Sequence, residues 1–362
     1  MRSRFIHTPH FLLQRYLVVA YLLFIIYVSL SPLSGWQDQG LSFTDVLAAP
    51  LSQTFTWFDF ILNFTSYMPL GLLITYILHK HFPPLKTMLL ATLFGLALSL
   101  TMEYLQLYLP TRVSSNTDLL SNTFGALTGA AFALHITQYN WFHQLGNWHD
   151  KFFRRGRVSD FGLALIFLWI FAQTNPTLPM LGSVFVSEVA RWPYDIVPAT
   201  PFNWLESTEV SLNLFLLGIL LFTLLRDNRH ALNALLFVLC IVSLIKFIAA
   251  AILLKSWALL LWLNSEAIFG IMAGLIILAI VKRFQYHWLI ACAAVASLSY
   301  LTLVLDLLIE SPPSAAMRIY HWHYVHMLNY NGFSQIIILI FPALLLSYLW
   351  RVAMQKRKSP PF

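Results

Sequence analysis

The sequence predicts an all-α fold, a polytopic integral membrane helix bundle of about ten transmembrane helices with both termini cytoplasmic. Hydrophobic residues make up 59% of the 362 residues and charged residues only 10%, unlike the composition of soluble domains. Apolar stretches long enough to cross about 30 Å of hydrocarbon recur along the chain. Lys and Arg gather in the segments between alternate stretches, as expected for loops that stay in the cytoplasm.

The apolar stretches define the expected helices. The first one follows Arg2, Arg4 and Arg15, but no small-residue cleavage site follows closely, so we expect a retained helix rather than a signal peptide. Cys240 and Cys292 fall inside expected helices, which argues against a disulfide framework or a cysteine metal site. The expected spans are 12–33, 57–79, 86–109, 118–138, 159–175, 209–226, 230–254, 256–281, 285–309 and 332–350.

The positive charge follows the expected topology. Most of the 22 Lys and Arg residues fall on one side of the membrane when the helices alternate in direction. The net charge of +7 therefore gives no reason to expect nucleic acid, and clusters such as KFFRRGR at 151–157 suit anionic headgroups of the inner leaflet. Arg112, Arg191 and Arg318 are exceptions, because they stand in expected outer loops.

Three parts are expected along the chain: a four-helix unit at 1–139, a basic cytoplasmic loop at 140–157, and a six-helix unit at 158–362. The first four helices of the six-helix unit are a candidate degenerate repeat of the four-helix unit. Prolines that end helices and small residues at helix contacts are common in membrane proteins, so coincidence stays open. The matching positions are Pro32 with Pro176, Gly125/Gly129 with Gly270/Gly274, and Asp59/Asn63 with Glu209/Asn213.

A polar segment, EYLQLYLPTRVSSNTDLLSN at 103–122, separates the third and fourth expected helices. With the expected orientation, polar residues from three helices reach a similar shallow depth at the outer face. A carboxylate at that depth costs several kcal/mol unless it is paired, protonated or hydrated, so it should face the bundle interior or a watery cleft. The members of this outer polar cluster are Asp59, Asn63, Glu103, Gln106, Arg112, Asp118 and Asn122.

The cluster permits two interpretations. In the first it is a ligand-binding site, because the planar guanidinium of Arg112 can hold a carboxylate or a phosphate in bidentate fashion. In the second it is structural: Asp118 caps its helix, Arg112 pairs with Glu103, and Asn63 and Asn122 hydrogen-bond between helices. The convergence of so many polar residues at one depth favours the site.

The segment from about Tyr21 to Ala133 resembles the VanZ-like family. The resemblance rests on SLSP at 29–32, DFILNFTSYMPLGLL at 59–73 and MEYLQLYLPTRVSSNTDLLSNTFGALTG at 102–129. It implies a bacterial cell-envelope protein of a family named for a member that lowers susceptibility to the glycopeptide teicoplanin, and it implies no settled reaction. The family positions carried over are Asn63, Pro69, Gly71, Glu103, Gln106, Arg112, Asp118, Asn122, Gly125 and Gly129.

Four of these positions point to helix packing. Gly125 and Gly129 share one helix face, where missing side chains let another helix approach closely. Pro69 and Gly71 interrupt the second expected helix and predict a kink or a locally opened backbone.

Other polar residues give weaker signals. His321, His323 and His326 stand close together, but their spacing suits no single helix face and the neighbouring aromatics indicate an interfacial belt, so we expect no metal site. Lys246 and Glu266 lie inside expected helices and mark either a transport path or a static pair. No motif for a cofactor appears.

Three functions remain open. The first is binding or translocation of an anionic polyprenyl-phosphate-linked envelope lipid, with Arg112 on the phosphate. The second is a membrane-embedded enzyme in which Glu103 and Asp118 act as general acid and base. The third is a non-catalytic scaffold with envelope protein partners. In each case the expected location is the bacterial cytoplasmic membrane, as a multi-pass protein in the lipid bilayer.

Overall fold

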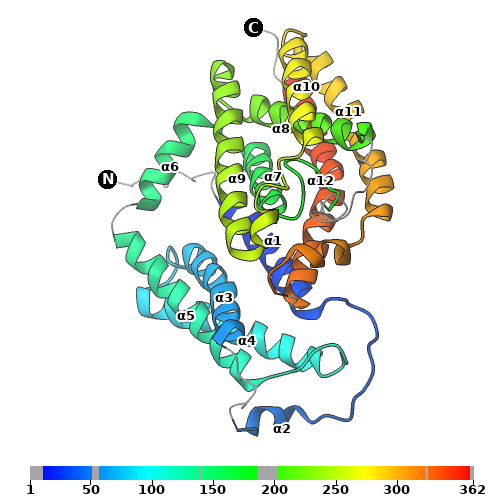
Figure 1. Cartoon of the computed structure of the whole chain (residues 1–362). Helices are drawn as coiled ribbons and strands as arrows, with labels where there is room; N and C mark the ends of the chain where they lie inside the picture. The colour runs from blue at the N-terminus through cyan, green and yellow to red at the C-terminus, as the bar shows by residue number, and fades with distance from the viewer. Residues whose placement is uncertain (1–10, 51–56, 139–140, 186–201, 323–324, 359–362) are drawn as a thin grey trace, which may run out of the picture. The chain divides into compact units, whose positions relative to one another are not determined.

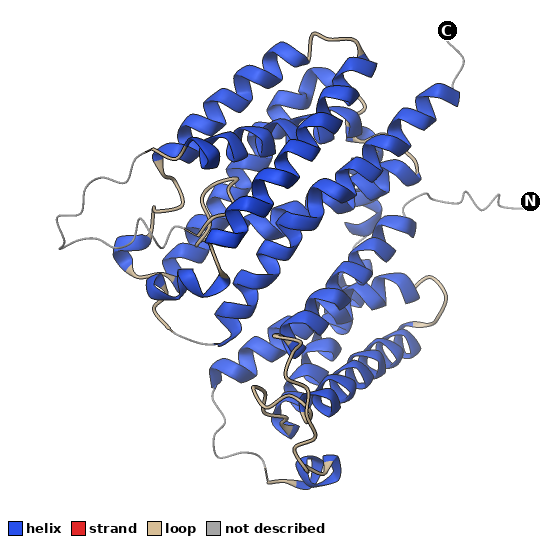
Figure 2. Ribbon diagram, turned by 90° about the vertical axis from the view of Figure 1, so that its right-hand side faces the viewer, coloured by secondary structure: helices blue, strands red, loops and turns tan. Residues whose placement is uncertain are grey.

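The computed structural model describes residues 11–50, 57–138, 141–185, 202–322 and 325–358. Within these ranges every regular element is a helix (Figures 1 and 2). Eight helical segments are long and apolar enough to cross a membrane. The protein is therefore an all-α, multi-pass membrane protein, as the sequence predicts.

Each expected span coincides with one helix. α7 and α10 have 17 residues each and rise only about 26 Å, slightly less than the hydrocarbon core, so they are not among the eight. The helices are α1 (Phe11–Leu30), α3 (Trp57–Leu78), α4 (Pro84–Gln106), α5 (Asn116–Gln138), α7 (Arg157–Gln173), α8 (Trp204–Leu224), α9 (Ala231–Leu253), α10 (Ser265–Val281), α11 (Tyr286–Glu310) and α12 (Val325–Lys358).

Some expected boundaries are wrong. The span at 256–281 becomes a helix only at Ser265, because η2 (Ser256–Ala258) and further turns precede it and Asn264 caps α10 by accepting from the Ala267 N–H. Two short helices were not expected, α2 (Phe43–Ala48) and α6 (Trp141–Phe152). The remaining short elements are η1 (Asn228–His230) and η3 (Pro313–Ile319).

The chain divides into two compact units, Met1–Lys151 and Phe152–Phe362. In the first unit α3 packs along α5, α4 packs against both, and α1 contacts α3 and α4. α3 remains helical through Pro69. The helices α3, α4 and α5, which bear most of the outer polar cluster, are therefore in direct contact in this unit.

In the second unit α8 lies at the centre and contacts α7, α9, α10 and α11, while α12 packs against α7 and α11. Leu214, Leu217 and Leu220 of α8 are completely buried, as is typical of a helix that is apolar on every side. Residues 174–185 leave α7 without forming a helix, and Asn175–Ser183 are all buried. Inside a membrane protein such backbone needs partners from the protein itself.

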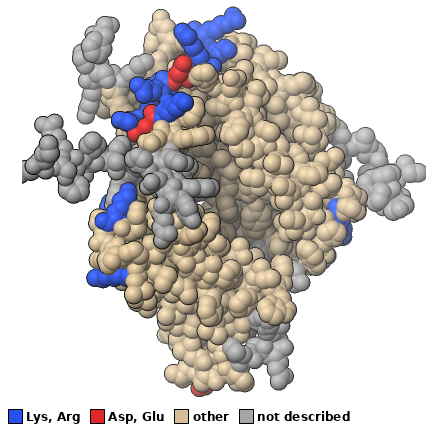
Figure 3. All heavy atoms as spheres, turned by 90° about the vertical axis from the view of Figure 1, so that its left-hand side faces the viewer, with Lys and Arg blue, Asp and Glu red and all other residues tan. Residues whose placement is uncertain are grey.

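Charged side chains occupy limited areas of the surface. On the face drawn in Figure 3, Lys and Arg side chains gather in a few places, and most of the visible described surface carries no charge. Many large apolar side chains are exposed, among them Leu23, Ile61 and Leu93. Such a surface suits contact with the lipid bilayer.

Candidate functional site

The contact between α3 and α5 depends on glycine. A Cβ at Gly125 would collide with the carbonyl oxygen of Phe64, and a Cβ at Gly129 with that of Met68. On the opposite helix, a Cβ at Gly71 would collide with the carbonyl of Ala126. The two backbones therefore touch along this contact, which fixes the depth at which polar side chains of α3 and α5 meet.

Asn63 and Asp118 meet at the end of this contact nearer the starts of α3 and α5. The Asn63 side chain hydrogen-bonds to the Asp118 carboxylate, and Asp59, one helical turn before Asn63, lies close enough to interact with Asp118 electrostatically. One turn deeper, the Asn122 side-chain amide donates to the Ser99 hydroxyl of α4 at 2.9 Å. α5 is thus linked to both neighbours by side-chain hydrogen bonds.

Glu103 lies on α4 one turn above Ser99 and is only 4% exposed. Its carboxylate accepts a 2.8 Å hydrogen bond from the Ser115 backbone N–H, in the turn before α5. It also interacts electrostatically with Asp118. The structure therefore places Asn63, Glu103, Asp118 and Asn122 around one polar interior at the meeting of α3, α4 and α5.

The side chains of Arg112 and Gln106 hydrogen-bond to the C-terminal end of α1. The Arg112 Nε donates to the Ser31 carbonyl at 3.0 Å and its Nη2 donates to the Val28 carbonyl at 2.7 Å. The Gln106 amide donates to the Ser29 carbonyl at 3.0 Å. The last carbonyls of a helix have no partners within it and carry partial negative charge, so a guanidinium suits this position.

The expected pair of Arg112 with Glu103 is therefore wrong. Neither side chain forms an ion pair within the described residues, and each uses backbone partners instead. Burial lowers the pKa of Arg112 from its ordinary value, but the side chain remains a cation at neutral pH.

Two buried oxygens of the cluster are left without a hydrogen-bond partner in the described part of the protein, Gln106 Oε1 and Asn122 Oδ1. Buried polar atoms are normally satisfied by protein, water or ligand. Both oxygens are acceptors, as are the carboxylates of Glu103 and Asp118 when ionised. The hydroxyls of Tyr67 and Ser114, which can donate as well as accept, are also buried without a partner among the described residues. The interior thus holds unpaired polar groups, mostly oxygens that accept, which a ligand with O–H and N–H groups would satisfy.

Sequence reasoning missed three residues of this interior: Tyr67, Ser99 and Ser115. Tyr67 is 3% exposed and lies near Ser99, Glu103 and Asp118. A signal existed for two of them, because Tyr67 follows Asn63 by four residues and Ser99 precedes Glu103 by four, which puts each on the same helix face. Ser115 acts through its backbone and left no such signal.

A second polar centre lies in the other unit, around Lys246, a residue that the sequence singles out but whose partners it does not show. Lys246 of α9 is completely buried and donates to the carbonyls of Asn175 at 2.7 Å and Leu178 at 2.9 Å. The expected pairing of Lys246 with Glu266 is wrong, because Glu266 accepts from the backbone N–H of Asn203 and from Ser265. Lys246 thus holds the buried non-helical segment rather than a neighbouring acid.

Other side chains support the same segment. The Gln173 side chain accepts from the Leu181 N–H at 2.9 Å, and the Asn213 amide donates to the Leu181 carbonyl at 2.7 Å. Glu209 accepts from the Ser183 N–H at 3.2 Å. These bonds provide the partners that buried backbone requires.

The histidine cluster is described only in part, because His323 and the side chain of His326 lie outside the described residues. Among the residues that the structure describes, no group of three His, Cys, Asp or Glu side chains could hold a metal ion.

Comparisons with known proteins agree with the resemblance in the first unit. Residues 17–138 match the family model described as VanZ/LLP1. No curated protein and no solved structure matches the chain. The matched segment contains α1 from residue 17 onward, all of α3, α4 and α5, and every residue of the outer polar cluster.

Proposed function

We propose that this chain, whose residues 17–138 are VanZ-like, recognises an anionic lipid-linked or peptidoglycan-related component of the bacterial cell envelope. The site is the polar interior between α3, α4 and α5, and we expect it to open to the outer face of the cytoplasmic membrane. The observation that carries the proposal is a buried acceptor without a partner among the described residues, Asn122 Oδ1, in the interior that also holds the carboxylates of Glu103 and Asp118.

The chemistry of the site selects the ligand class. Sugar hydroxyls and peptide amides donate hydrogen bonds, so they match an interior rich in carboxylate and amide oxygens. Arg112 can still offer an N–H to an anionic group, because among the described residues only its Nε and one terminal nitrogen find acceptors. A sugar or peptide joined to a polyprenyl phosphate combines hydrogen-bond donors with an anionic group.

Lipids that co-purify with the protein provide the test. Protein extracted with its native lipid is compared with Asn122→Leu, and Thr128→Leu serves as the control because Thr128 is an exposed residue of the same helix. We expect a polyprenyl-phosphate-type lipid to be enriched by the parent and the control but lost from Asn122→Leu. Identical lipid profiles in all three proteins would refute the proposal.

The family resemblance adds a cellular expectation. If the site acts on a glycopeptide-relevant envelope component, deletion of the protein should change teicoplanin susceptibility, and Asn122→Leu should behave like the deletion. If teicoplanin susceptibility in the deletion strain stays at the parental value, the protein has no role in resistance to teicoplanin.

A scaffold is the second candidate, and the hydrogen bonds between helices favour it. Gln106, Arg112 and Asn122 each join two helices, so the cluster could only stabilise the bundle for a protein partner. In that case Asn122→Leu lowers the melting temperature and leaves the lipid profile unchanged.

An enzyme remains an alternative because Glu103 and Asp118 are close enough to interact. General acid and base catalysis needs two such groups in different protonation states. Turnover of a labelled envelope lipid by purified protein, lost in Glu103→Gln, would establish it. Absence of turnover over a panel of envelope lipids leaves binding as the function.

A further inference from the structure

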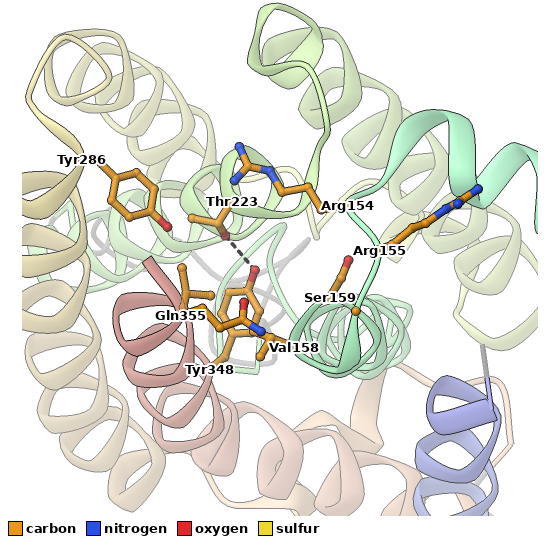
Figure 4. A pocket seen from close by; sticks show the side chains of 10 residues that line it. Arg154, Arg155, Val158, Ser159, Thr223, Tyr286, Tyr348 and Gln355 are labelled. Atoms are coloured by element: carbon orange, nitrogen blue, oxygen red, sulfur yellow. Dashed lines mark hydrogen bonds between the residues drawn. The ribbon is translucent and has the colours of Figure 1, made fainter. Parts of the chain in front are cut away.

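A pocket of about 190 Å³ lies at one end of the second unit (Figure 4). It is formed by the start of α7, the end of α8, the start of α11 and the end of α12. These are the four helix ends that the distribution of Lys and Arg predicts to be cytoplasmic. The pocket is therefore distinct from the outer polar cluster, and its function does not depend on that site.

Arg154 is held in place at the mouth of this pocket. Its backbone N–H donates to the Leu224 carbonyl at 2.9 Å, and its Nε donates to the Leu225 carbonyl at 2.9 Å. The Arg226 N–H in turn donates to the Phe152 carbonyl at 2.9 Å. These bonds tie the arginine to the end of α8, while its two terminal nitrogens have no partner within the described residues.

Hydroxyl groups face the same space. The Thr223 hydroxyl donates to the Leu220 carbonyl of its own helix at 2.9 Å and is also hydrogen-bonded to the Tyr348 hydroxyl at 2.9 Å. Figure 4 shows the Tyr286 hydroxyl pointing toward this pair below the Arg154 guanidinium. Ser159 is 7% exposed, lines the pocket, and its hydroxyl has no hydrogen-bond partner in the part of the chain that the structure describes. The pocket thus offers a cation and several hydroxyls at once.

The start of α7 adds to the attraction for an anion. Gly156, Val158 and Ser159 line the pocket, and they belong to the first turn of a 17-residue helix and the residue before it. N–H groups in a first turn have no partner within the helix and carry partial positive charge, which stabilises anions. Asp160, the acid of this turn, does not line the pocket, and none of the described lining residues is acidic.

The pocket volume limits the ligand. The volume of the pocket is several times the roughly 30 Å³ that one water molecule occupies in the liquid. It is smaller than the roughly 300 Å³ at which pockets for drug-sized ligands begin. A compact anionic group fits between these limits.

We propose that this pocket binds the phosphate group of a phosphomonoester, with Arg154 as the charged partner and Ser159 and Tyr286 as hydroxyl partners. Two sources share this chemistry: the headgroup of an inner-leaflet lipid, and a small soluble phosphate ester. An arginine with hydroxyl and helix-terminal N–H donors is the arrangement that phosphate recognition uses.

Binding of two probes to the full-length protein tests the proposal. The probes are phosphatidic acid, added to phosphatidylcholine nanodiscs that hold the protein, and glycerol 3-phosphate in solution. Arg154→Gln removes the charged partner, and Arg229→Gln is the matched control because Arg229 is exposed on η1 at the same expected side but does not line the pocket. The measured quantity is the dissociation constant.

We expect Arg154→Gln to weaken binding of one probe by about 10-fold to 100-fold, the effect of losing a hydrogen bond to a charged group, and Arg229→Gln to change it by less than about 3-fold. If Arg154→Gln weakens binding of phosphatidic acid, the ligand is a lipid headgroup. If it weakens binding of glycerol 3-phosphate, the ligand is a soluble phosphate ester. Equal effects of Arg154→Gln and Arg229→Gln, or no effect on either probe, would overturn the proposal.

A second variant covers the case in which Arg154→Gln does not fold. Tyr286→Phe keeps the ring and removes only the hydroxyl, and we expect it to weaken the same probe by about 3-fold to 10-fold. Unchanged affinity in Tyr286→Phe would then count against the pocket.

Discussion

Lys246 and Arg112, which are buried or partly buried, donate hydrogen bonds to backbone carbonyls rather than to acidic side chains. Lys246 donates to the carbonyls of Asn175 and Leu178, and Arg112 donates to those of Val28 and Ser31. These carbonyls lie at the end of α1 or in the non-helical segment after α7, where no α-helix pairs them. A cation there lowers the cost of leaving the backbone unpaired and is itself stabilised by the carbonyl dipoles.

Lys246→Met should destabilise the second unit. The substitution keeps most of the side-chain volume but leaves two buried carbonyls without their donor, so we expect the free energy of unfolding to fall by roughly 2–5 kcal/mol. Thermal unfolding in detergent measures the change. Lys255→Met is the control, because Lys255 is a lysine in the turn after α9 that donates to the Arg318 carbonyl at an exposed position. Equal melting temperatures for the two variants would contradict this role.

Arg112→Lys should loosen the end of α1. A lysine keeps the charge but cannot reproduce the planar fork that reaches two carbonyls, so a loss of about 1–3 kcal/mol in the free energy of unfolding is expected. Limited proteolysis near residue 33 should become faster than in the parent. If cleavage and melting temperature both stay at the parental values, the two hydrogen bonds contribute nothing to stability.

At the scale of helices, the contact between α3 and α5 organises the VanZ-like unit. Gly71, Gly125 and Gly129 all lie where a side chain would meet the backbone of the opposite helix. Close backbone contact replaces the hydrophobic effect, which does not drive association between helices in lipid. The positions of Asn63 and Asp118 across the contact follow from it.

Gly129→Leu should therefore separate α3 from α5, and the matched control is again Thr128→Leu. We expect a loss of several kcal/mol, because the backbone of Met68 cannot move aside as a flexible side chain would. Thermal unfolding in detergent measures the loss. Equal melting temperatures for Gly129→Leu and Thr128→Leu would show that the contact tolerates the side chain.

The helices could be predicted because each apolar stretch is as long as the membrane requires. The buried segment Asn175–Ser183 could not, because its composition is that of a surface loop and its partners, Lys246 and Asn213, lie far away in the sequence. The members of the outer polar cluster could be grouped because the sequence places them at a similar depth in the membrane. The partners of Arg112 could not be predicted, since the depth of a residue does not show which helix end lies beside its loop.

For the whole molecule, the two units share a packing feature that supports the proposed repeat. Gly270 and Gly274 of α10 face the carbonyls of Ser207 and Ser211 on α8, as Gly125 and Gly129 of α5 face those of Phe64 and Met68 on α3. An amide and a carboxylate also meet across each contact: the Asn63 side chain with Asp118, and Asn264 with Glu206 at 2.7 Å.

This correspondence changes the expected alignment. Asn63 precedes Phe64 and Glu206 precedes Ser207, so the counterpart of Asn63 is Glu206, rather than Asn213. Asn213 instead binds Trp169 and Leu181 within the second unit. We propose that the second unit keeps the helix contact of the first and uses its polar residues to hold a buried segment.

The orientation can be tested with a charged, membrane-impermeant maleimide. Val113→Cys lies in the turn between α4 and α5, where Val113 is 85% exposed, and Asn228→Cys lies in the exposed turn between α8 and α9. In a background without Cys240 and Cys292, we expect intact spheroplasts to label only the former. Labelling of Asn228→Cys before permeabilisation would reverse the topology and place the outer polar cluster in the cytoplasm.

Native mass spectrometry of the parent and Glu103→Gln measures whether the cluster between α3, α4 and α5 binds a ligand. Glutamine keeps an oxygen for the Ser115 N–H, so the variant should fold with a melting temperature close to the parent. We predict a bound envelope lipid on the parent that is reduced at least about 10-fold on Glu103→Gln. Equal lipid occupancy on both folded proteins would contradict it and leave the cluster as a structural element.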